Sequence, residues 1–160
     1  MPIRLWHQSV TPLQRDSDYA KALVRRAETV LQGQVSVETF GLPAENYDGN
    51  PPSSLLGNAF MNHRILGRFI DQAITAERQG YDGFVVGSFA DPLLTELRAA
   101  VDIHVVSLLE TSLLVGCTLG HKAAVITTAP NVVKMISRSI NHYRLWERVS
   151  EVVSVDPPLL

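Results

Sequence analysis

Residues 81–92, Tyr-Asp-Gly-Phe-Val-Val-Gly-Ser-Phe-Ala-Asp-Pro, decide the fold of this chain. The apolar run at 83–86 is short and is bounded by turn-forming residues on both sides, which predicts a strand buried on both faces. Asp91 is a favourable N-cap and Pro92 suits the first position of a helix, so we expect a helix to begin there. The strand is therefore predicted to end in a tight turn over 87–90 that leads directly into a helix.

The same alternation of apolar strands and amphipathic helices extends along the rest of the chain. Further strands are expected at 3–7, 35–40, 103–108 and 123–128, with another beginning at 148, and helices at 18–31, 62–79, 91–100, 110–119 and 130–143. Repeated β-α units of this kind indicate an α/β fold, a parallel Rossmann-like sheet flanked by helices. Residues 41–58 are irregular and are predicted to form a long loop, either a substrate-facing lid or an ordinary surface excursion.

Composition narrows the classes of partner and site. The net charge is −2 and 46% of residues are hydrophobic, so neither nucleic acid nor a membrane surface is expected, and small molecules are the favoured partners. Cys117 is the only cysteine, which excludes an internal disulfide and a zinc site of several thiolates and fits a cytoplasmic location. The histidines share no metal-ligand spacing, so no metal is expected.

Small polar residues follow the predicted strands at the edge where ligands bind in α/β sheets. The turn after the central strand carries Ser88 and Phe89, next to the positive end of a helix. Thr127 and Thr128 end another strand just before Pro130, so their hydroxyls and amides suit an anion. The sequence therefore predicts a small-molecule site built from strand ends.

Three stretches carry a resemblance to a known family. They are residues 81–92, Val-Val-Ser-Leu-Leu-Glu-Thr-Ser at 105–112, and Thr-Leu-Gly-His-Lys-Ala-Ala-Val-Ile-Thr-Thr at 118–128. In order and spacing the chain resembles the aspartate/glutamate/hydantoin racemase superfamily, and most closely its hydantoin-racemase-like branch. The resemblance implies two similar α/β domains with the active site between them: residues 1–108 as the N-terminal domain, and 109–160 as the start of a second, incomplete domain.

The resemblance also implies cofactor-independent chemistry, in which two cysteines flank the α-carbon of the substrate and transfer a proton from one face to the other. The position of the first cysteine is held here by Ser88, and the second would lie beyond Leu160. An unassisted serine is a much poorer base than a thiol. We therefore expect either a racemase acting on a small carboxylate or cyclic amide, or an altered relative: a decarboxylase-type enzyme or a small-acid binding module.

Site residues follow from the resemblance in the same way. Ser88 takes the catalytic position. Whether the chain assembles into a homo-oligomer is left open. The residues expected to contact the substrate are Gln8, Ser9, Phe89, Thr127 and Thr128.

Each candidate has a structural alternative. Ser88 could serve only as a small turn residue, and Thr128 could merely cap the following helix. His7, at the end of the first strand, is either a substitute base or a plain strand-end histidine. Cys117 fits a small buried hydrophobe better than a nucleophile. Glu110 matches an acidic residue of the family, or else complements a helix dipole.

Overall fold

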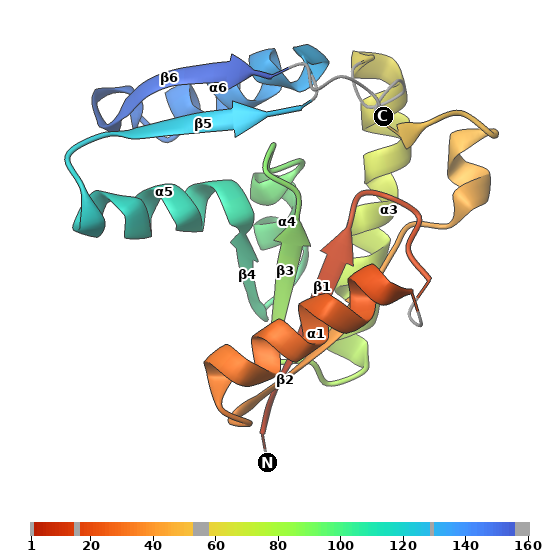
Figure 1. Ribbon diagram of the computed structural model, residues 1–160. Helices are drawn as coiled ribbons and strands as arrows, with labels where there is room; N and C mark the ends of the chain where they lie inside the picture. The colour runs from red at the N-terminus through yellow and green to blue at the C-terminus, as the bar shows by residue number, and fades with distance from the viewer. Residues whose placement is uncertain (1, 15–16, 53–57, 129, 156–160) are drawn as a thin grey trace.

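The computed structural model describes residues 2–14, 17–52, 58–128 and 130–155, which form two parallel sheets with helices packed against them (Figure 1). The first sheet has the strand order β2-β1-β3-β4, and the second pairs β5 with β6. All pairings are parallel. The strands are β1 Ile3–Ser9, β2 Val35–Phe40, β3 Gly83–Gly87, β4 His104–Ser107, β5 Ala123–Thr127 and β6 Val149–Ser154.

Helices connect successive strands, which gives the alternating order that the sequence predicts. They are α1 Asp18–Leu31, α3 Ala59–Arg78, α4 Leu94–Ala100, α5 Leu108–Leu119 and α6 Val133–His142, with short 3₁₀ turns η1 Ala44–Tyr47, η2 Pro130–Val132 and η3 Trp146–Arg148. The predicted α/β class, a parallel sheet flanked by helices, is confirmed. Its strands are divided between two sheets.

A large apolar cluster lies between one face of the first sheet and the helices α3 and α4. Trp6, Phe84 and Val105 point into it from three neighbouring strands. Helix α3 contributes residues spaced three and four apart, which brings them to one face of the helix. They are Ile65, Leu66, Phe69, Ala73 and Ala76.

A smaller apolar cluster holds the second sheet. Leu109 and Leu113 of α5 and Ile136 and Ile140 of α6 meet the inward side chains of β5 and β6 there. On the opposite face of β5, Ile126 is 66% exposed. The helices therefore cover only one side of this two-stranded sheet.

The predicted role of Asp91 as the N-cap of the next helix is wrong. Helix α4 begins at Leu94, and both Asp91 (φ 46°) and Leu93 (φ 55°) have left-handed backbone conformations. An N-cap residue is normally extended, which lets its side chain fold back over the first turn. The Asp91 carboxylate instead accepts hydrogen bonds from the amides of Leu109 (3.2 Å) and Glu110 (3.0 Å), in the first turn of α5.

Two other boundaries differ from expectation. Helix α3 begins at Ala59, because Asn58 Oδ1 accepts the amide hydrogens of Phe60 and Met61 and so caps it. The predicted loop at 41–58 contains the 3₁₀ turn η1, while its residues 53–57 lie outside the described part of the chain.

In the part that is described, no helix combines the length and apolar character that a membrane span requires.

Gly87, at the end of β3, leaves no room for a side chain. A Cβ placed there would lie 2.5 Å from His7 Nε2 and 2.8 Å from the backbone oxygen of Gln8. We expect Gly87→Ala to lower the free energy of unfolding by about 1–3 kcal/mol, because β1 and β3 must move apart. Urea unfolding measures this.

Gly67→Ala is the matched control, since a Cβ on this helical glycine meets nothing within 4 Å. It should stabilise the chain by roughly 0.5–1 kcal/mol. Equal effects of the two substitutions would contradict the steric argument.

Candidate functional site

A cavity of about 220 Å³ lies where the carboxyl ends of β3 and β5 face each other. The loop after β3 forms one wall, and the end of β5 with the start of α6 forms the other. The lining residues are Val10, Asn62, Leu66, Ser88, Phe89, Ala90, Pro92, Ile126, Thr127, Val132, Met135 and Ile136. Mostly apolar walls with a few polar groups are typical of small-molecule sites.

Ser88 is the first residue after β3 and lines the cavity. Its Oγ accepts the amide hydrogen of Ala90 at 3.3 Å, so the side chain also stabilises its own turn. The structural reading of Ser88 as a turn residue and its position in the cavity wall are therefore compatible. Phe89, the next residue, lines the same cavity and is 38% exposed.

The two threonines after β5 have different positions. Thr127 is the last residue of the strand, is half-buried and lines the cavity. Thr128 is exposed and is absent from the lining. The alternative role of Thr128 as the cap of α6 is wrong, because the turn η2 intervenes and Val132 holds the N-cap position.

Gln8 and Ser9 lie inside the end of β1 rather than in the cavity lining. Gln8 is fully buried; its Oε1 accepts the indole hydrogen of Trp6 at 2.9 Å, and its Nε2 donates to the backbone oxygen of Ser9 at 3.1 Å. Ser9 Oγ accepts the amide hydrogen of Thr11 at 3.1 Å. Both side chains hold the end of the strand, and Val10 is the residue of this segment that reaches the cavity.

His7 is buried beside Gly87 and does not line the cavity. His7 pairs with Thr39 of the neighbouring strand β2. Neither His7 Nδ1 nor Thr39 Oγ1 has a hydrogen-bond partner in the described part of the chain. Burial lowers the pKa of His7, so the imidazole is neutral at physiological pH. It has the protonation state of a base but lies behind the cavity wall.

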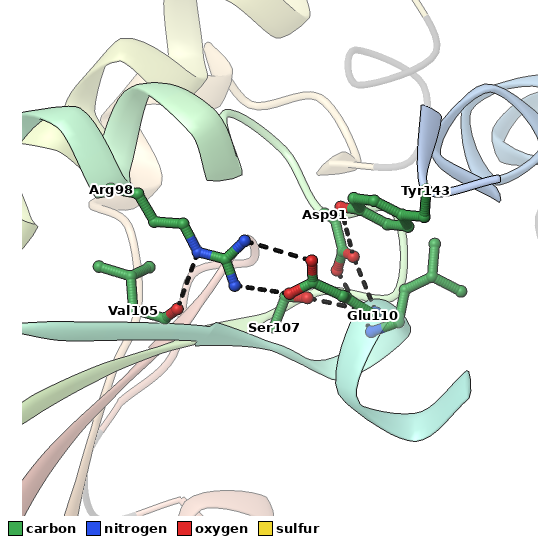
Figure 2. A network of polar contacts seen from close by, with 7 residues as sticks. Asp91, Arg98, Val105, Ser107, Glu110 and Tyr143 are labelled. Carbon is green, nitrogen blue, oxygen red and sulfur yellow. Dashed lines mark hydrogen bonds and ion pairs between the residues drawn. The ribbon is translucent and has the colours of Figure 1, made fainter. Parts of the chain in front are cut away.

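Glu110 and Cys117 also lie outside the cavity lining. Arg98 holds the Glu110 carboxylate with two hydrogen bonds, of 2.5 and 3.2 Å, as Figure 2 shows. Cys117 is half-buried in α5. Across residues 2–14, 17–52, 58–128 and 130–155, no group of three or more His, Cys, Asp and Glu side chains is arranged to hold a metal ion.

Several cavity residues lie on helices in which no sequence pattern indicates a functional role. Asn62 comes from α3 and Met135 from α6. Their helical periodicity predicts which face is buried, but it does not predict that the two faces meet at one cavity.

Fold and site together define a class: a parallel α/β protein with a largely apolar cavity between two sheets. Residues 17–157 match the Asp/Glu/Hydantoin racemase family, and the chain belongs to that family. The superfamily predicted from the three sequence stretches is thereby confirmed.

Similar proteins include two curated hydantoin racemases. The chain is 28% identical to the one from Rhizobium meliloti over 109 residues, which is 68% of this chain and 45% of the relative. It is 28% identical to the one from Pseudomonas sp. (strain NS671) over 83 residues, which is 52% of this chain and 33% of the relative. The chain therefore spans less than half the length of the curated relatives it matches.

Two solved structures share the fold. An allantoin racemase from Klebsiella pneumoniae superposes with a TM-score of 0.80 at 18% identity, over 99% of this chain and 60% of that one. An allantoin racemase from Pseudomonas fluorescens gives a TM-score of 0.70 at 18% identity, over 95% and 60% respectively.

Burial of His7 predicts a pH dependence of stability. Its pKa is lowered below 6.5 in the folded chain, so the unfolded chain binds the proton more readily. Stability is therefore undiminished above about pH 6.5 and falls at lower pH, by up to about 1.4 kcal/mol per pH unit. We expect His7→Gln to remove this part of the slope in urea unfolding between about pH 7.5 and 5.5; identical slopes would contradict the prediction.

Proposed function

We propose that the cavity binds a small carboxylate or a cyclic amide of the hydantoin type, and that the chain acts in cofactor-independent proton transfer at the α-carbon. The observation that carries this proposal is that Ser88, which directly follows β3, and Thr127, the last residue of β5, line one cavity although the two strands belong to different sheets. Family membership and the names of the relatives, hydantoin and allantoin racemases, support the same substrate class.

The proposed roles follow from the chemistry of the walls. The Thr127 hydroxyl would donate to a ring carbonyl or carboxylate oxygen, and Ser88 would lie against one face of the α-carbon. Apolar neighbours such as Phe89 and Ile136 would exclude water, which strengthens polar contacts inside the cavity. Gln8, Ser9 and Thr128 would contribute by supporting these strand ends.

Racemisation needs a base on one face of the α-carbon and an acid on the other. The described residues that line the cavity include no carboxylate, imidazole, thiol or amine. An unassisted serine hydroxyl is too weak a base for the first step. In this proposal the chain binds and orients the substrate around Ser88. A base from outside the described lining would remove the α-proton, directly or through the Ser88 hydroxyl, and an acid on the opposite face would return a proton.

The hydrogen bonding of Ser88 favours a second candidate, a catalytically altered relative that binds a small acid or protonates it from one face only. Ser88 Oγ already accepts a hydrogen bond within its own turn. A side chain held in this way suits ligand contact better than proton abstraction.

The division into a domain at 1–108 and the start of another at 109–160 is part of this proposal. The separation of the buried residues into two clusters supports it. The cavity would then lie at the junction of the two domains, where small-molecule sites are common.

Ligand binding is tested with a panel of 5-substituted hydantoins and the corresponding amino acids. We expect at least one to raise the melting temperature, and Thr127→Val to weaken its binding about three- to tenfold through loss of one hydrogen bond. Thr118→Val is the matched control, because that hydroxyl donates to the Val115 carbonyl on α5 and lies outside the cavity. If no compound of the panel raised the melting temperature, or if both variants bound the ligand equally well, the proposal would be contradicted.

Proton transfer is tested separately by deuterium exchange at the α-carbon in heavy water. We expect Ser88→Cys to increase exchange in a Cys117→Ser background, because a thiolate is accessible near neutral pH. The Cys117→Ser protein is the control. If Ser88→Cys binds the ligand but exchanges no proton, the binding-module candidate replaces the racemase.

A further inference from the structure

The Asp91 carboxylate joins three segments that are distant in sequence. Asp91 is 7% exposed and follows the cavity loop after β3. Its Oδ1 accepts the Leu109 amide hydrogen, and its Oδ2 accepts both the Glu110 amide hydrogen and the hydroxyl hydrogen of Tyr143, the latter at 3.0 Å (Figure 2). One buried side chain thus links the loop, the start of α5 and the end of α6.

A second contact from α6 reaches the same loop. Ser139 Oγ donates to the backbone oxygen of Ala90 at 3.2 Å. Ser139 precedes Tyr143 by four residues, so both lie on one face of the helix. The same face continues through Met135 and Val132, which line the cavity. One stripe of α6 therefore forms the cavity wall at one end and holds the opposite wall at the other.

The loop needs these contacts because its backbone is disfavoured on its own. Asp91 and Leu93 both have positive φ angles, which residues with a Cβ seldom adopt. A buried carboxylate also requires donors to replace water. Burial and the neighbouring Asp91 raise the pKa of Tyr143, so its hydroxyl keeps its proton and donates at neutral pH.

We propose that Asp91, through its hydrogen bond from Tyr143, is a positioning residue that fixes the Ser88 loop relative to Thr127 and so sets the width of the cavity. The contact from Ser139 to the Ala90 backbone supports the same loop independently. Asp91 itself does not line the cavity. The link from cavity width to ligand affinity rests on the function proposed above. The positioning of the loop does not.

Amide hydrogen exchange tests the positioning without any ligand. In Tyr143→Phe we expect the amides of Ala90, Leu109 and Glu110 to exchange about three- to tenfold faster, because the loop loses one hydrogen bond that holds it. The amide of Val86, inside β3, should keep its rate. Tyr81→Phe is the matched control: it also removes a tyrosine hydroxyl that donates to a carboxylate, here Glu38 at 2.6 Å, near the start of β3.

Unchanged exchange at Ala90 and Leu109 in Tyr143→Phe, or a uniform increase that includes Val86, would overturn the positioning role. Ser139→Ala offers a second, milder variant that removes only the contact to Ala90. Its expected signature is faster exchange at Ala90 and little change at Glu110.

Binding of 5-methylhydantoin then tests the effect on the cavity. We expect Tyr143→Phe to raise its Kd about three- to tenfold and Tyr81→Phe to leave it unchanged. Asp91→Asn should bind 5-methylhydantoin more tightly than Asp91→Ala does, since the amide oxygen of asparagine still accepts a hydrogen bond. Faster exchange with unchanged Kd would overturn the link to the cavity, whereas a native chain that binds no hydantoin would refute the proposed function and leave the exchange result to decide the positioning.

Discussion

The close contact between His7 and Gly87 determines where the cavity begins. Parallel pairing aligns Ser9 of β1 with Gly87 of β3, so the chain leaves both strands at the same edge of the sheet. The His7 imidazole occupies the space that a side chain at Gly87 would need. Ser88 follows immediately, and its position at the cavity is therefore a consequence of how tightly two central strands approach each other.

The second wall of the cavity depends on a different kind of contact. Apolar packing brings α6 against α5, but polar contacts from Ser139 and Tyr143 connect α6 to the loop after β3. Tyr143 also packs against both apolar clusters. The two sheets therefore meet through a small set of directional contacts, and the cavity lies beside them.

Local sequence patterns predict the elements well and the site only partly. Ser88 and Thr127 could be found because each follows a recognisable strand. The first strand ends in Gln8 and Ser9, as expected, but strand alternation turns the Gln8 side chain into the core. The capping rule failed at Asp91 because its carboxylate meets the amides of a helix that begins seventeen residues later. Capping patterns consider only the next few residues, so they do not predict a contact with a helix that lies further along the chain.

The exposed outer face of β5 has a consequence for the order in which the protein loses its structure. Parallel sheets are normally covered on both faces, and Ile126 is left in solvent on a sheet of two strands. The apolar cluster behind this sheet is also the smaller of the two described. On warming we expect β5, β6 and α6 to detach while the four-stranded sheet is still intact, so that the cavity between the two sheets is lost at a lower temperature than most of the secondary structure.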